Sequence, residues 1–293
     1  MRIVVITGQT ATGKTTYALN LVKKENGELI NCDSRQIYKH MDIITGKDKP
    51  KNVKINLYDI ITPNQYFSSF DYVQHALPII KKILTENKTP IIVGGSYLYL
   101  KHLLYNIETE NILPNWRLRK KLADKTLQEL QEILKKKSVQ SFNRLNNSDK
   151  NNPQRLIRKI EISQTPFEPS QLELGYNNKI IIANKLGIKN IDVDFIGLYF
   201  KDKEELRRKI IKRVENRLNQ GAISEVKNLL KMDYKENDPG LKTIGYQQII
   251  KFLNGKISKE KAIEEWVNKE IQYAKRQYTF MKKDKNIRWT ILS

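Results

Sequence analysis

Residues 8–15 of this 293-residue chain read Gly8-Gln9-Thr10-Ala11-Thr12-Gly13-Lys14-Thr15, which matches the phosphate-loop pattern G-x-x-x-x-G-K-[ST]. A β-branched run at 2–7 precedes the match, and a helical pattern at 14–24 follows it. A strand, a Gly-rich turn and a helix in this order direct backbone N–H groups and the positive end of a helix at a phosphate group. We therefore predict a loop that binds a diphosphate or triphosphate, in which Lys14 contacts the terminal phosphate and Thr15 offers a hydroxyl to Mg²⁺.

Strand-like and helical segments alternate around this loop. Further strands are predicted at 28–32, 55–61 and 90–93, and a helix at 70–86. A later apolar strand, at 193–200, is expected to rejoin the same sheet. The alternation predicts an α/β fold with a P-loop NTPase-like parallel sheet flanked by helices.

The pattern changes near Pro114. Leucines spaced three to five residues apart predict an amphipathic helix over 116–137, and Pro153 is expected in the first turn of another helix. We expect three regions along the chain: the first part of the P-loop core at 1–113, a helical insertion at 114–190, and at 191–293 a return to the sheet followed by basic helices.

The chain is strongly basic. It has 53 Lys and Arg against 32 Asp and Glu, a formal net charge of +21, and the first 100 residues hold only 13 basic and 8 acidic side chains. A surplus concentrated downstream suits a polyanionic partner better than a codon bias towards Lys, which would spread evenly. The single cysteine excludes an intramolecular disulfide framework, and three His argue against structural zinc. No apolar run approaches the ~20 residues of a membrane span, so we expect a cytoplasmic protein without membrane attachment. We also expect a monomer.

Beyond the second predicted strand, the chain reads Asp33-Ser34-Arg35-Gln36-Ile37-Tyr38 and continues to Met41-Asp42-Ile43. Together with the phosphate loop, this block resembles the tRNA dimethylallyltransferase (tRNA isopentenyltransferase) family, whose pattern is D-S-x-Q-x-Y-x-x-M-D-I. Five further blocks resemble family patterns in the family's order: Val93-Gly-Gly-Ser96-Tyr-Leu-Tyr99, Asn152-Pro-Gln154-Arg155-Leu156-Ile157-Arg158, Arg213-Val-Glu-Asn-Arg217-Leu-Asn-Gln-Gly221, Thr243-Ile-Gly245-Tyr246-Gln247 and Tyr273-Ala-Lys275-Arg276-Gln277. Any one block alone is weak, but jointly they are specific and cover nearly the whole chain.

The resemblance implies a reaction. A dimethylallyl group passes from its diphosphate to N6 of adenosine 37, beside the anticodon of a tRNA, and forms N6-dimethylallyladenosine with the help of Mg²⁺. The phosphate loop would then hold the pyrophosphate of the isoprenoid, without ATP hydrolysis. The expected partners are tRNA and dimethylallyl diphosphate, and the expected cofactor is Mg²⁺ at Thr15.

This chemistry assigns roles to a few side chains. Adenine N6 is a poor nucleophile, so a base must take its proton while the diphosphate leaves. Asp33 is the candidate base, as the resemblance also implies, and capping of the following helix is its alternative role. Arg213 joins Lys14 in holding the diphosphate; otherwise it shares a solvated helix face with Arg217, four residues on. Thr10 is the third catalytic candidate, as a phosphate contact, although loop geometry alone also explains it.

A base that is drawn out of its stack must be held by stacking and hydrogen bonds, because extrusion costs a few kcal/mol. Near the C-terminus, Lys275 and Arg276 alternate with Tyr273, Tyr278 and Phe280, a mixture typical of single-stranded RNA recognition; a core position suits Phe280 equally well. The resemblance implies tRNA contacts from the following residues: Asp33, Ser34, Arg35, Gln36, Ser96, Arg119, Gln154, Arg155, Leu156, Ile157, Arg158, Thr243, Gly245, Tyr246, Gln247, Lys275, Arg276 and Gln277.

The chain departs from the family pattern at several positions. Gln9 replaces a Pro, Thr12 a Ser and Ser96 a Thr, and the Met of the Arg213 block is Arg217. The family's G-T-A-K-P turn is replaced by Ile-Thr-Gly-Lys-Asp-Lys-Pro at 44–50. Three other functions stay open: a P-loop kinase of a small substrate, a P-loop RNA-binding protein without transferase activity, and an isopentenyltransferase that acts on free AMP.

Overall fold

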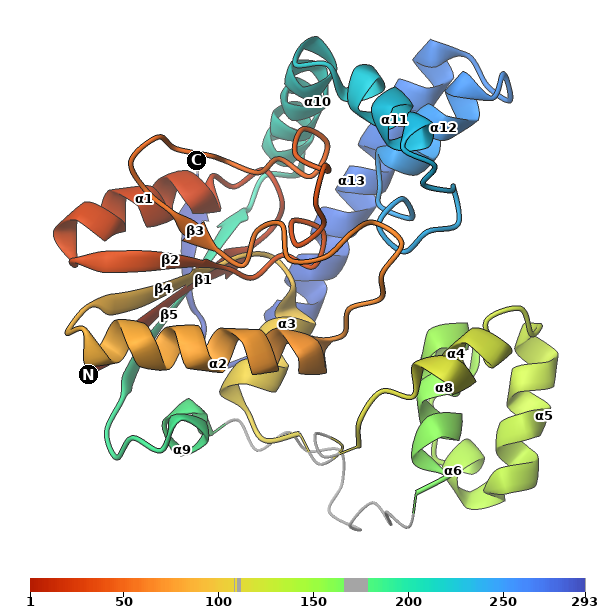
Figure 1. Cartoon of the computed structure of the whole chain (residues 1–293), viewed down its shortest axis with the longest axis horizontal. Helices are drawn as coiled ribbons and strands as arrows, with labels where there is room; N and C mark the ends of the chain where they lie inside the picture. Colours follow the sequence, from red (N-terminus) through yellow and green to blue (C-terminus); the bar gives the residue numbers. More distant parts are fainter. Residues whose placement is uncertain (108, 110–111, 166–178, 293) are drawn as a thin grey trace. The chain divides into compact units, whose positions relative to one another are not determined.

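The computed structural model describes residues 1–107, 109, 112–165 and 179–292, which form two compact units (Figure 1). The first unit spans the ranges 1–105 and 178–293, and the second spans 106–177. Among the described residues, none of the helices has both the length and the apolar character that crossing a membrane demands.

The first unit is built on a six-stranded sheet in the order β3-β2-β4-β1-β5-β6, and every neighbouring pair is parallel. Its strands are β1 (Arg2–Gly8), β2 (Gly27–Asn31), β3 (Ile55–Asn56), β4 (Thr89–Val93), β5 (Asp192–Phe200) and β6 (Arg288–Leu292). Because parallel strands point the same way, the loops that follow β2, β4 and β1 meet at one edge of the sheet. The predicted α/β fold with a parallel, P-loop-type sheet is confirmed.

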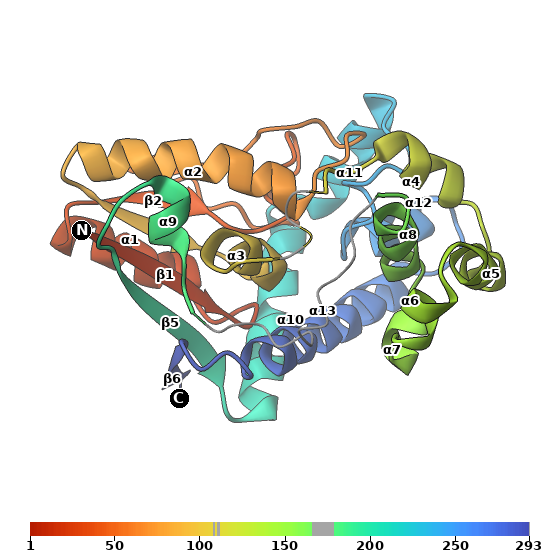
Figure 2. The ribbon, with the colours of Figure 1, turned by 90° about the horizontal axis from the view of Figure 1, so that it is seen from below.

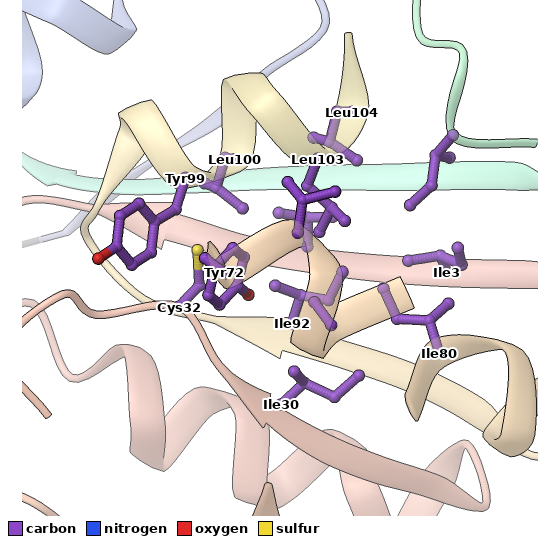
Figure 3. Packing of buried hydrophobic residues seen from close by; sticks show 14 of the residues in the cluster. Ile3, Ile30, Cys32, Tyr72, Ile80, Ile92, Tyr99, Leu100, Leu103 and Leu104 are labelled. Atoms are coloured by element: carbon purple, nitrogen blue, oxygen red, sulfur yellow. The ribbon is translucent and has the colours of Figure 1, made fainter. Parts of the chain in front are cut away.

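Helices cover both faces of this sheet, which explains the continuous apolar strands. Successive residues of β1 point to opposite faces: Ile3 and Val5 pack with α2 (Ser69–Thr85) and α3 (Tyr97–Leu104), whereas Val4 and Ile6 pack with α1 (Lys14–Lys24). Figure 3 shows the first of these layers, with strand isoleucines packed against aromatic and leucine side chains of the two helices.

A helical layer follows β5 in the chain. Its members are α10 (Lys203–Asn219), α11 (Ala222–Lys231), α12 (Tyr246–Leu253) and α13 (Lys259–Met281). They share a core around Trp266, and α10 packs along α13 (Figure 2). The last turns of α13 reach the sheet, where the Met281 sulfur lies 3.1 Å from the Thr7 hydroxyl.

The second unit has its own small core of leucines, isoleucines and Phe142. Its helices are α4 (Trp116–Leu122), α5 (Leu127–Lys137), α6 (Val139–Asn143), α7 (Asn147–Lys150) and α8 (Pro153–Ile162). The helix predicted over 116–137 is two helices, because Thr126 forms a capping box with Glu129 and starts α5 afresh. Pro153 does open α8, as expected.

Three other sequence predictions need correction. The predicted strand 55–61 shortens to two residues, because Leu57 and Asp59 adopt positive φ angles that no strand accommodates. The strand β6 was not predicted. The second unit ends at 177 and not at 190, because α9 (Ile182–Leu186) buries Ile182 and Leu186 in the core beneath the sheet.

Candidate active site

The phosphate loop connects β1 to α1 in the predicted position. Gly13 caps the N-terminus of α1 with φ 71°, a conformation that glycine adopts without strain. The loop is held from inside, since the Thr12 hydroxyl donates to the Gln9 carbonyl at 2.8 Å. The Gln9 side-chain oxygen in turn accepts from the Phe200 N–H at 2.9 Å, which ties the loop to the end of β5.

The Lys14 ammonium lies over this loop, 2.5 Å from the Gln9 carbonyl oxygen. Burial, and next the positive charge of Arg213, lower the pKa of Lys14 to about 7, while the charges of Asp33 and Glu270 oppose that shift. In the part of the chain that the structure describes, the Lys14 ammonium has no anionic partner within ion-pair distance. A diphosphate in the loop would supply that partner and restore the charge.

Two helices of the C-terminal layer reach the same loop through Thr10. The guanidinium of Arg213, on α10, donates to the Thr10 hydroxyl. Gln277, on α13, accepts from the Thr10 N–H at 2.8 Å and donates to the Gly95 carbonyl at 3.1 Å. The loops after β1 and β4 are thereby fastened to each other and to α13. Arg213 is thus not a solvated helix-face residue but faces the phosphate loop.

Asp33 follows β2 and is half-buried at the same edge of the sheet. One carboxylate oxygen accepts from the Arg35 N–H at 2.8 Å and forms an Asx turn. In the part of the chain that the structure describes, its second oxygen has no hydrogen-bond partner. The carboxylate therefore combines a fixed position with one oxygen available to a substrate, as a general base requires. The residues directly after Asp33 form turns and not an α-helix, so the alternative role as a helix cap does not apply.

The loop after β4 supports this carboxylate. The Ser96 hydroxyl accepts from the Ser34 N–H at 2.8 Å and donates to the Ser34 hydroxyl at 3.1 Å. The two loops approach so closely that a Cβ on Gly94 would lie 2.1 Å from the Cys32 carbonyl oxygen. Glycine is therefore required there, and the Gly-Gly-Ser block serves to bring Ser96 against the Asp33 segment.

The loop at 42–47 is fastened to α11 and approaches two arginines of α10. The Glu225 carboxylate accepts from the N–H groups of residues 42, 43 and 44 at 2.7, 2.6 and 3.1 Å. The Gln36 amide donates to the carbonyls of Thr45 and Gly46 at 3.1 and 2.9 Å. Gln36 thus organises this loop, and its amide N–H groups are not directed to a base.

Several residues predicted to contact tRNA have other duties in the first unit. Tyr246 is fully buried and donates to Glu225 at 2.6 Å, so its predicted RNA contact is corrected to a core role. Thr243 is buried, Gly245 caps α12, and Gln247 donates to two loop carbonyls. Lys275 and Arg276 are exposed on α13, and so is Phe280, which favours surface over core for that ring.

The remaining predicted contacts lie in the second unit. Its buried Glu161 accepts from Arg119 at 2.7 and 3.0 Å and also pairs with Arg158. Arg155 pairs with Asp149, so three predicted phosphate contacts carry carboxylate partners. Gln154 is exposed. By contrast, Ile157 packs on the core and Leu156 is fully buried, which corrects the prediction of an RNA contact for Leu156.

Sequence reasoning missed two features of α13. Glu270 was not singled out, and Gln277 was expected on the RNA and not on the phosphate loop. Both belong to a buried stripe with Trp266, Ala274 and Met281. A polar side chain at a core position of an amphipathic helix was the available signal, because such groups are buried only with a partner.

These features of the sheet and the site define a P-loop protein that acts on a phosphorylated substrate. The phosphate loop and its two cations provide the phosphate site, and the carboxylate at the neighbouring strand end lies beside it. A model of the IPP transferase family matches residues 36–284. The chain belongs to the IPP transferase family, and it is a transferase.

Individual relatives are similar in sequence or in structure to nearly the whole chain. It is 34% identical to a tRNA dimethylallyltransferase of Alkaliphilus oremlandii, across 100% of this chain and 92% of the relative. The full-length tRNA isopentenylpyrophosphate transferase of Bacillus halodurans has a TM-score of 0.69 at 29% identity, across 99% of this chain and 89% of that one. The tRNA delta(2)-isopentenylpyrophosphate transferase of Staphylococcus epidermidis has a TM-score of 0.68 at 31% identity, across 99% and 92%. The predicted family is confirmed.

Proposed function

We propose that this chain transfers the dimethylallyl group of dimethylallyl diphosphate to N6 of adenosine 37 in tRNA and forms N6-dimethylallyladenosine. Family membership and the names of the relatives support the reaction class. The observation that carries the proposal for this chain is local: the charge of the Asp33 carboxylate acts on Lys14 of the phosphate loop, and Arg213 donates to Thr10 of the same loop.

The reaction assigns one task to each group. As the bond from N6 to C1 of the isoprenoid forms, the carboxylate of Asp33 takes the N6 proton. The C1–O bond breaks, and its electron pair leaves with the diphosphate. Lys14, Arg213 and the N–H groups at the start of α1 stabilise that growing negative charge, because they are already in place around it.

Mg²⁺ fits this site as a partner of the diphosphate. Among the described residues, no group of three or more His, Cys, Asp or Glu gathers to hold a metal by itself. Mg²⁺ commonly takes most of its ligands from substrate phosphates and water, with one or two from protein. Thr15, in the first turn of α1, would supply the protein oxygen. When bound, the ion adds positive charge to the leaving diphosphate.

The tRNA would engage both units. Residues 178–293 carry 26 basic and 15 acidic side chains, against 13 and 9 in residues 106–177. The larger surplus supports phosphate contacts from the exposed Lys275 and Arg276, with Phe280 available for stacking. We assign a shape-reading role to the second unit, in which Arg119, Arg155 and Arg158 are already paired with carboxylates. The acting protein is proposed to be a cytoplasmic monomer.

The test is incubation of the protein with Mg²⁺, labelled dimethylallyl diphosphate and unmodified tRNA, followed by digestion to nucleosides. Label is expected in N6-dimethylallyladenosine. A parallel reaction with AMP in place of tRNA distinguishes an enzyme for free nucleotide, and one with ATP distinguishes a kinase. Turnover of ATP without labelled nucleoside would refute the proposal.

A further inference from the structure

Two positions at which the chain departs from the family pattern touch each other in the structure. Gly46 stands in the altered turn, and Arg217 replaces a Met on α10. A Cβ built on Gly46 would lie 2.6 Å from an Arg217 guanidinium nitrogen and 3.2 Å from one of Arg213. Residue 46 also has φ +68°, so a glycine there leaves room for both guanidinium groups and accepts the backbone conformation.

Arg217 is deeply buried, and among the described residues its acidic partner is Glu270 of α13. Its guanidinium donates to the Glu270 carboxylate at 3.1 Å, and the indole N–H of Trp266 lies 3.4 Å from the same oxygen. The side chains of Arg217 and Glu270 are only 4% and 10% exposed. Burial, and next the charge of Arg213, lower the pKa of Arg217 to about 9, while the charge of Glu270 opposes the shift.

We propose that Arg217 is a positioning residue for Arg213: it neutralises Glu270 and so leaves Arg213 directed at Thr10 and the diphosphate. The proposal rests on the proposed function in one respect, namely that the phosphate loop binds a diphosphate. Arg213 and Arg217 stand one helical turn apart, so both lie within reach of the same buried carboxylate. Arg217 occupies that carboxylate, and repulsion between like charges turns Arg213 outward.

The consequence of losing Arg217 follows from electrostatics. A buried carboxylate without a partner is costly, and it recruits the nearest cation. That cation is Arg213, which would leave the Thr10 hydroxyl and take up an inward position. The diphosphate would then meet one cation fewer, because Arg213 would be engaged by Glu270. Removal of both Arg217 and Glu270 eliminates the competition, so Arg213 keeps its outward position.

The experiment measures binding of inorganic pyrophosphate by calorimetry and the KM for dimethylallyl diphosphate. Arg217→Met is expected to weaken pyrophosphate binding about tenfold or more, the scale of one lost charge-assisted contact. Arg217→Met combined with Glu270→Gln is expected to return within about threefold of the unchanged protein. Arg217→Lys, which keeps the positive charge, is expected to rescue binding. The matched control is Arg208→Met, which removes an exposed arginine from the same helix.

The outcomes distinguish two roles of Arg217: positioning of Arg213, and support of the fold alone. A supporting role predicts that pyrophosphate affinity follows the thermal unfolding temperature and that the double variant binds no better than Arg217→Met, which would overturn the proposal. If Arg217→Met does not fold, Glu270→Gln decides: affinity equal to or tighter than that of the unchanged protein supports the proposal, and weaker affinity overturns it. Absence of pyrophosphate binding by the unchanged protein would refute the diphosphate site itself, and with it the proposed function.

Discussion

The pH dependence of diphosphate binding should report directly on Lys14. In the ligand-free protein, burial and Arg213 lower the pKa of this ammonium from 10.5 to about 7. A bound diphosphate places negative charge against it and raises that pKa again. Binding therefore takes up a proton. The affinity is greatest below pH 7, where Lys14 is already charged, and it falls as the pH rises from 7 towards the pKa of the complex.

The size of the effect follows from the shift. At pH 7 roughly half a proton is taken up per diphosphate bound, and at pH 8 and above about one. The affinity should then fall by about tenfold per pH unit between pH 8 and 9, because the charged fraction of Lys14 falls by about tenfold for each pH unit above its pKa.

Calorimetry in buffers of different ionisation enthalpy measures the proton uptake directly. Lys14→Arg is the control, because arginine stays charged throughout and leaves only the titration of the diphosphate itself. The difference between the two proteins isolates the lysine. Equal proton uptake by the unchanged protein and Lys14→Arg at pH 8 would contradict a lowered pKa of Lys14 in the ligand-free protein.

Three further changes test other parts of the molecule. Asp33→Ala should keep tRNA binding in a gel-shift assay but abolish dimethylallyl transfer; loss of tRNA affinity would contradict its role as the base. Lys275→Ala should weaken tRNA binding and reduce the slope of log affinity against log salt by about one, and an unchanged slope would exclude a phosphate contact. Glu161→Gln leaves Arg119 and Arg158 without their shared carboxylate, and it should destabilise the second unit by about 1–3 kcal/mol after allowance for their partial exposure. Hydrogen exchange should then quicken in 112–165 and not in the sheet, whereas a uniform change would show that the two units unfold together.

Local patterns were sufficient to predict the part of the fold that lies around the phosphate loop. The β-branched run and the loop spacing predicted β1 and α1, whose observed bounds are Arg2–Gly8 and Lys14–Lys24. By contrast, β6 was missed because it is a short strand at the edge of the sheet, with Ile291 58% exposed. Its pairing with β5 depends on tertiary position, which a window of sequence does not contain.

The same division applies to the site. Lys14 and Asp33 were found because their neighbours in sequence form a recognisable block. Gln277 and Glu270 act at long range, on Thr10 and Arg217 respectively. Their partners are fixed only when α13 crosses α10 and the sheet edge, so periodicity marked them at most as polar residues on a buried face.

The bond between Thr10 and Gln277 joins residues 267 positions apart. During synthesis, the loop at the start of the chain therefore remains without its fastening until almost all of the chain has been made. A nascent or truncated chain would carry the Gly-Lys-Thr signature and still lack a finished anion site, because α10 and α13 arrive late. The anion site is therefore complete only after contacts of long sequence separation have formed, and such contacts form late in folding.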